Sequence, residues 1–150
     1  MRLSRRSALG VIALAAVPGC TWFGGDEDEE IPEPEAPEGL AARGREPVER
    51  IERVELGRTA TGLALTAFGL APGLGYARPR LVPRREGRPS QDGYLEFDML
   101  AIPPDPDRDL PRGEPSARRL RADILLSNDE LEGLRGLRVF ALEGGQQLSF

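Results

Sequence analysis

Short apolar runs separated by turn-forming residues place the strongest constraint on how residues 47–150 can fold. In the runs Tyr94–Ile102 and Arg119–Ser127, apolar and charged residues alternate with period two, which is typical of a strand with one face in a core. Thr61–Phe68 and Leu137–Leu142 are further apolar runs of strand length. Glycine, proline and aspartate cluster between the runs, a spacing typical of all-β folds. We expect a mainly β domain, either a small antiparallel β-sandwich or a barrel-like fold.

Four other segments complete this expectation. Val48–Leu56 has both helical and strand spacing, and we favour a strand. Ser127–Glu130 matches a capping box that starts one short helical turn. Residues 103–115 hold closely spaced prolines and aspartates, which predict a loop. Gly144 and Gly145 can adopt the positive φ that a two-residue turn needs, so we expect the chain to close with a hairpin.

Composition narrows the chemistry open to this chain. Its 150 residues include no histidine, no lysine and one cysteine. A Ser-His-Asp triad, a Cys-His pair, a Schiff-base lysine and a histidine or thiolate zinc site all need residues that are missing here. An intrachain disulfide would need a second cysteine. We therefore expect no metal and no cofactor, and we favour a domain that is not an enzyme.

The acidic residues are unevenly distributed. Eight of them lie between Asp26 and Glu38 without an arginine, together with prolines at positions 32, 34 and 37. Such a segment buries too little apolar surface to fold, and its prolines favour extended polyproline geometry. From Gly39 onward, 17 acidic residues balance 17 arginines, so we expect no nucleic-acid binding. We interpret residues 20–46 as a disordered acidic tether and residues 47–150 as one β domain.

The first 19 residues have the layout of a secretory signal. Basic residues precede the apolar run Ala8–Val17, and compact residues lead from this run to Cys20. A helix that spans a bilayer needs about 20 apolar residues, roughly twice the length of this run. The segment therefore predicts an export signal rather than a permanent transmembrane helix.

The end of this signal, Val17–Cys20 or VPGC, resembles the lipobox of bacterial lipoproteins. The resemblance implies that the thiol of Cys20 carries diacylglycerol and that residues 1–19 are removed. The family more often has Leu where Val17 stands and Ala or Ser where Pro18 stands. Thr21 occupies the position at which some lipoproteins carry an inner-membrane retention Asp, so the resemblance favours the outer membrane. The alternative is an ordinary cleaved signal with an unrelated cysteine.

The segment Ser4–Gly10, SRRSALG, is also similar to the twin-arginine export motif. Ser4, Arg5, Arg6 and Leu9 match the motif, whereas Ala8 replaces its Phe and Gly10 replaces its Lys. A general secretory signal would also carry basic residues here. Both export routes remain open at this point.

The strongest local field in the domain comes from five arginines between positions 78 and 88. Only Glu86 opposes them, and guanidinium groups bind phosphate and carboxylate bidentately. They are Arg78, Arg80, Arg84, Arg85 and Arg88. One interpretation is a site for anionic envelope polymers or lipid headgroups. The other is a solvated loop between two strands, facing the acidic tether.

Glu96 and Asp98 offer a third kind of site, because they share one face of an expected strand. At this spacing their carboxylates can lie within about 7 Å, near the separation that paired-acid hydrolases use. The alternative is structural: if the strand from Arg119 lies alongside, Arg119 and Arg121 would pair with these carboxylates across the sheet.

We expect an envelope protein that is anchored to a membrane by acyl chains, faces the periplasm, and uses its β domain to contact another envelope component. The alternatives are a module that binds an anionic ligand and a carboxylate-based hydrolase. We assign no catalytic residues.

Overall fold

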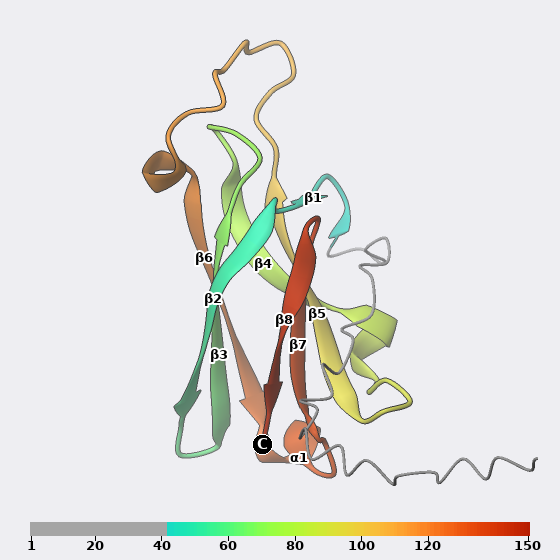
Figure 1. Cartoon of the computed structure of the whole chain (residues 1–150). Helices are drawn as coiled ribbons and strands as arrows, with labels where there is room; N and C mark the ends of the chain where they lie inside the picture. The colour runs from blue at the N-terminus through green and yellow to red at the C-terminus, as the bar shows by residue number, and fades with distance from the viewer. Residues whose placement is uncertain (1–41) are drawn as a thin grey trace, which may run out of the picture.

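The computed structural model describes residues 42–150, which form two β-sheets packed face to face (Figure 1). The expected mainly β, sandwich-like fold is thus confirmed. The lipobox with Cys20, the Arg5–Arg6 pair and the tether lie outside the described residues, apart from the last residues of the tether range.

Within residues 42–150, eight strands follow one another, with short helical turns between some of them. They are β1 (Glu46–Pro47), β2 (Arg50–Arg58), β3 (Gly62–Leu70), β4 (Ala77–Pro83), the 3-10 turn η2 (Arg84–Gly87), β5 (Tyr94–Ile102), the 3-10 turn η3 (Pro115–Arg118), β6 (Arg119–Ser127), α1 (Asn128–Leu131), β7 (Gly136–Ala141) and β8 (Gly144–Ser149). The loop between β5 and η3 lies at one end of the molecule, and α1 and the C-terminus lie at the other (Figure 1).

The larger sheet has five strands in the order β1-β5-β7-β8, with β4 paired to the other edge of β5. The smaller sheet has the order β2-β3-β6. All pairs are antiparallel except β5 with β7. This parallel pair arises because the chain leaves β5, crosses to the smaller sheet as β6, and returns through α1. The larger sheet is therefore mixed rather than purely antiparallel.

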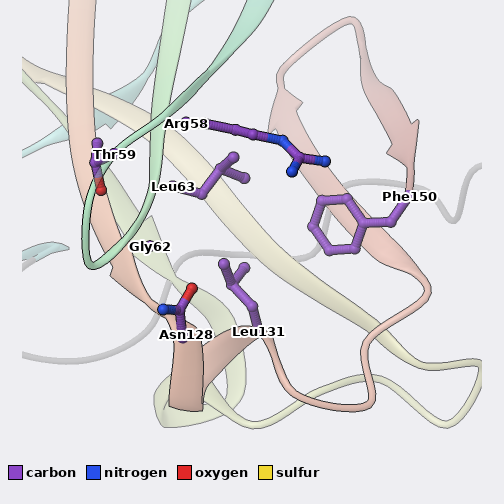
Figure 2. A pocket seen from close by; sticks show the side chains of 7 residues that line it. All are labelled: Arg58, Thr59, Gly62, Leu63, Asn128, Leu131 and Phe150. Carbon is purple, nitrogen blue, oxygen red and sulfur yellow. The ribbon is translucent and has the colours of Figure 1, made fainter.

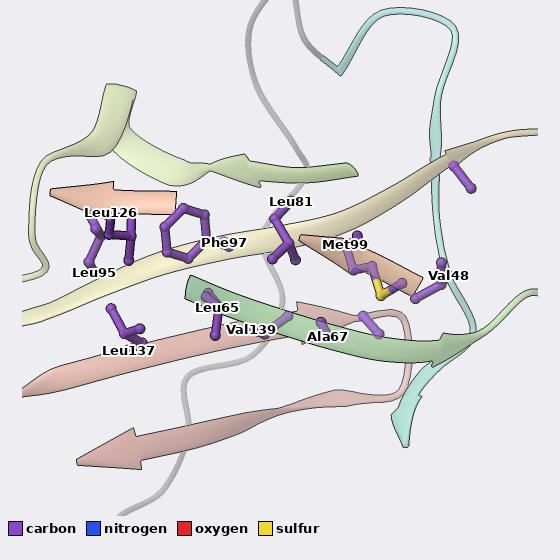
Figure 3. Packing of buried hydrophobic residues seen from close by; sticks show 13 residues of the cluster. Val48, Leu65, Ala67, Leu81, Leu95, Phe97, Met99, Leu126, Leu137 and Val139 are labelled. Carbon is purple, nitrogen blue, oxygen red and sulfur yellow. The ribbon is translucent and has the colours of Figure 1, made fainter. Parts of the chain in front are cut away.

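The core lies between the sheets (Figure 3), and buried apolar side chains from β3, β4, β5, β6 and β7 meet there. Leu95, Phe97 and Met99 reach it from β5, while Leu65 and Ala67 reach it from β3; all five are buried. On β6 the expected alternation is confirmed, because residues 120, 122, 124 and 126 pack toward the core and Arg119, Arg121 and Asp123 are exposed.

Two further local expectations are confirmed. The segment from Val48 to Leu56 contributes to β2, not to a helix. The capping box is complete, since Ser127 Oγ accepts a hydrogen bond from the amide of Glu130, and the carboxylate of Glu130 accepts one from the amide of Ser127. Gly133 follows with φ +74°, in the left-handed conformation that favours glycine after a helix.

The closing hairpin forms, but its turn lies two residues earlier than expected. Ala141 pairs with Gly144, so Leu142 and Glu143 are the turn residues. Only Gly144, at φ +91°, uses the left-handed conformation, and Gly145 lies within β8. A type I turn followed by one left-handed glycine also joins antiparallel strands, which is why a Gly-Gly pair need not be the turn itself.

Two expectations about the larger sheet are wrong. Residues 77–83 were expected to belong to a basic loop, but they form β4, with an irregular register between Ala77 and Arg80. In β5, Glu96 and Asp98 do point away from Leu95 and Phe97, but this second face is not open to solvent. Every residue from Tyr94 to Ala101 is buried, because side chains from η2 and β7 cover the second face.

Candidate functional site

The outer face of the larger sheet brings together the two groups of residues that the sequence singles out. Opposed residues of neighbouring strands share a face, and β4 places Val82 opposite Asp98. The chain then turns back at η2, where Arg85 and Glu86 adopt φ +50° and +57°. This left-handed backbone is costly for residues other than glycine, and it carries Arg84 and Arg85 over β5.

Arg84 and Asp98 form a bidentate ion pair. The Nε atom of Arg84 lies 3.0 Å from Oδ2 of Asp98, and its Nη2 atom lies 2.8 Å from Oδ1. The guanidinium also lies 3.9 Å from the ring centroid of Phe140 on β7, within range of a cation–π interaction. Both charged side chains are buried, so the pair joins η2, β5 and β7 beneath the surface.

Glu96 is held by two arginines, Arg85 and Arg138. Its side chain accepts hydrogen bonds from both, and the contact to Nη1 of Arg138 measures 3.3 Å. Arg138, on β7, also lies 2.7 Å from Asp92 and 3.9 Å from the ring centroid of Tyr94. The exposed fractions of the Glu96 and Arg138 side chains are both 1%. A buried charge is tolerated when it is paired and hydrogen-bonded in this way.

The electrostatics of this cluster follow from its hydrogen bonds. Burial by itself lowers the pKa of Arg138, but hydrogen bonds to Asp92 and Glu96 outweigh it and raise the pKa above its ordinary value. Hydrogen bonds from Ser90 and Arg138 hold the pKa of Asp92 below its ordinary value. The hydrogen bond between Asp92 and Arg138 therefore stabilises the charged form of both side chains.

A polar cavity of about 500 Å³ adjoins this cluster. It is lined by Arg85, Pro89, Ser90, Gln91, Asp92 and Glu96. A second cavity, of about 340 Å³, lies beside α1 and the C-terminus, where the side chains of Leu63, Leu131 and Phe150 converge below Arg58 (Figure 2).

The structure divides the five predicted anion-binding arginines into two groups. Arg84 and Arg85 neutralise Asp98 and Glu96, and Arg88 lies 3.0 Å from Glu86 in an exposed pair. Arg78 and Arg80 are exposed and form no ion pair within residues 42–150. The open positive charge of the segment is thus concentrated at the start of β4.

The expected partners of Glu96 and Asp98 are wrong. Arg119 and Arg121 belong to β6, which pairs with β3 in the other sheet. There Arg119 lies 3.0 Å from Glu52, and Arg121 lies 2.8 Å from Asp123. The carboxylates of Glu96 and Asp98 are instead occupied by Arg84, Arg85 and Arg138, so their geometry is that of ion pairs within a sheet.

Sequence reasoning missed Arg138, Asp92, Tyr94 and Phe140 as members of this cluster. One signal was present, because Arg138 is the only charged residue in the apolar run Leu137–Leu142. A charge within a strand that is otherwise apolar predicts a buried partner. The identity of that partner depends on the parallel pairing of β5 with β7, which places Arg138 opposite Glu96.

Within residues 42–150, no group of three or more acidic residues is placed to hold a metal ion. Among the same residues, no helix has the length and apolar character needed to cross a bilayer. Comparison with protein-family models, with curated proteins and with solved structures gave no match. The class that the fold defines is a small mixed β-sandwich with buried arginine–carboxylate pairs on one outer face.

Proposed function

We propose that this chain is a bacterial envelope lipoprotein whose β domain is a non-enzymatic interaction module. The observation that carries the proposal is the leader, in which a basic segment and a short apolar run end in VPGC. Two or three acyl chains on Cys20 would anchor the protein durably, since each buried methylene contributes about 0.8 kcal/mol.

The position of the domain in the chain supports this proposal. All described strands lie between Glu46 and Ser149, so the whole segment from Thr21 to Glu38 is available as a spacer. At about 3.3 Å per residue it reaches at most roughly 60 Å. The domain would then contact its partner away from the bilayer.

Mass spectrometry of the N-terminal peptide from the native membrane fraction tests the anchor. We expect a peptide that begins at Cys20 and carries diacylglycerol. Cys20→Ala is the matched variant, and we expect it to keep the leader and to carry no lipid. An unmodified Cys20 in the wild-type protein would contradict the proposal.

Crosslinking in intact cells tests the interaction. We expect one reproducible envelope protein to be captured by the wild-type chain, and we expect less capture by Cys20→Ala and by a variant that lacks residues 24–39. If the wild-type protein hydrolyses an envelope substrate and Glu96→Gln does not, the result would instead support a carboxylate-based hydrolase.

One observation favours a second candidate function, the binding of an anionic ligand. Arg78 and Arg80 lie two positions apart in β4, and both side chains are exposed. Neither forms an ion pair within residues 42–150. The guanidinium group of either arginine can pair with a phosphate or carboxylate group. Binding that does not weaken with added salt or in Arg78→Gln/Arg80→Gln would contradict this function.

A further inference from the structure

The arginine surface at the start of β4 lies close to the point where the described chain begins. This surface consists of Arg43, Arg45, Arg78 and Arg80. Arg45 donates a hydrogen bond from its guanidinium to the carbonyl oxygen of Arg78, and its amide donates to the carbonyl of Ala42 at 3.0 Å. The N-terminal boundary of the described residues is thus tied to β4.

The register shows which way part of this surface faces. Arg80 lies opposite Leu100 of β5, and Pro47 of β1 lies opposite the same residue. Opposed residues share a face, so Arg80 lies on the outer face of the larger sheet together with Asp98. The carboxylate of Glu46, in β1, accepts a hydrogen bond from the hydroxyl of Tyr76 at 2.8 Å. No ion pair reaches Arg43, Arg45, Arg78 or Arg80 from residues 42–150.

A segment of opposite charge to the arginine surface lies a few residues before it in the sequence. The acidic segment Asp26–Glu38 carries eight carboxylates and no base. Only four peptide units separate Glu38 from Ala42, which at about 3.5 Å each places the end of this segment within roughly 14 Å of the domain. A connection as short as this gives an effective concentration in the millimolar range.

We propose that the acidic segment Asp26–Glu38 docks on the arginine surface of its own domain. Guanidinium–carboxylate pairs would hold it there, and the contact weakens with salt because the groups are exposed. An external anion that binds Arg78 and Arg80 must displace this segment. The tether is thus both a spacer and an internal competitor. This inference uses the same arginines as the anion-binding function, but it does not depend on lipid attached to Cys20.

Paramagnetic relaxation in the chain of residues 20–150 tests the docking. This chain contains every described residue, and Cys20→Ser with Ala36→Cys leaves a single site for a spin label within the acidic segment. At low salt we expect the amide signals of Arg80, Val82 and Leu100 to lose roughly half their intensity or more, since the effective concentration favours the docked state. The amides of Thr66 and Asp123, on the other sheet, should keep theirs.

Two variants and a salt titration make the result specific. We expect Arg78→Gln/Arg80→Gln to abolish the broadening, because the variant removes two of the guanidinium groups. We expect 0.5 M salt to abolish it too, because the Debye length is only about 4 Å at that concentration. Arg50→Gln/Arg58→Gln is the matched control, because both residues are exposed on β2 of the other sheet; it should leave the broadening unchanged. Equal broadening on both sheets, or broadening that survives in Arg78→Gln/Arg80→Gln, would overturn the proposal.

Two further measurements separate this inference from its alternatives. A mixed sample reports docking between copies: one chain carries the spin label, and the other carries the isotope label and no spin label. Broadening that is seen only in this mixture would overturn docking within one chain. Inorganic pyrophosphate serves as the anion probe. We expect it to bind about tenfold more tightly when all eight acidic residues are replaced by their amides, since the competitor is then removed. Unchanged affinity would overturn the inference, although loss of pyrophosphate binding in Arg78→Gln/Arg80→Gln would still support the anion-binding function.

Discussion

Arg84 and Asp98 are joined by two hydrogen bonds between η2 and β5, and the exposed fractions of their side chains are only 6% and 5%. The guanidinium lies against Phe140 at the same time. This buried charge pair connects η2 to β5 and β7, so the cost of removing one partner should greatly exceed that of breaking a surface ion pair.

Asp98→Ala should therefore lower the free energy of unfolding by about 3–5 kcal/mol, because it removes the carboxylate that pairs with buried Arg84. Urea unfolding followed by circular dichroism measures this change. Glu55→Ala is the control: it breaks the exposed pair with Arg53, and it should cost at most about 1 kcal/mol. The double replacement Arg84→Met/Asp98→Leu should recover much of the lost stability. Equal costs for Asp98→Ala and Glu55→Ala would contradict a structural role for the pair.

Glu49 should make stability dependent on pH in the acidic range. It accepts hydrogen bonds from Arg118 at 2.8 Å and from Arg112 at 2.7 Å. The hydrogen bond from Arg118 is the largest cause that holds the pKa of Glu49 below its ordinary value of 4.5, and burial opposes it. A lowered pKa in the folded state means that the stabilisation is complete above pH 4.5 and is lost as the pH falls through the folded-state pKa.

Glu49→Gln tests this dependence. The variant should be less stable than the wild-type protein at pH 7, and its unfolding free energy should fall less steeply below pH 4.5. Chemical unfolding at a series of pH values measures both quantities. Glu132→Gln, at an exposed position after α1, is the control. Parallel pH profiles for Glu49→Gln and the wild-type protein would show that this carboxylate does not contribute.

Gly62 should not tolerate a side chain. A Cβ atom at this position would lie 1.9 Å from the carbonyl oxygen of Leu126, so β3 and β6 would have to separate. Gly62→Ala should cost about 3 kcal/mol, at the upper end of the range for overpacking. Gly57→Ala, in the same sheet, is the matched control, because its Cβ would meet only Cβ of Ala64 at 3.9 Å. Thermal unfolding of the two variants compares them, and similar melting temperatures would contradict the close approach of β3 to β6.

The export route can be decided at Arg5 and Arg6. If the twin-arginine route is used, Arg5→Lys/Arg6→Lys should abolish export, because the variant no longer has the arginine pair that matches the motif. A general secretory signal needs only positive charge in this segment, so the same variant would then be exported normally. Immunoblots of periplasmic and membrane fractions distinguish the two results, with Arg2→Lys as the control.

Sequence alternation located most strands but missed β4. The positions of β5 and β6 match the expected runs exactly, because alternation is a local property of each strand. β4 contains Pro79 and Pro83 and two exposed arginines, so neither its composition nor its periodicity predicts a strand. It forms because it pairs in antiparallel fashion with β5, the next strand along the chain.

The candidate sites show the same division. The arginine segment and the Glu96–Asp98 pair are both visible in the sequence, but as two separate sites. Only the fold shows that Arg84 and Arg85 neutralise those carboxylates, and that Arg138 completes the cluster from the parallel strand β7. Within residues 42–150, fewer arginines of the segment are therefore available to bind an anion than its composition suggests.

By itself, the sequence determined the β class of this domain, most of its strands and the capped turn after β6, because these depend on residues within a few positions of one another. The tertiary structure decided which strands are neighbours, which face of β5 is covered, and which charges meet. The physical reason is that period-two alternation is the same for every possible strand partner, whereas burial and ion pairing depend on contacts between residues that are far apart in the chain.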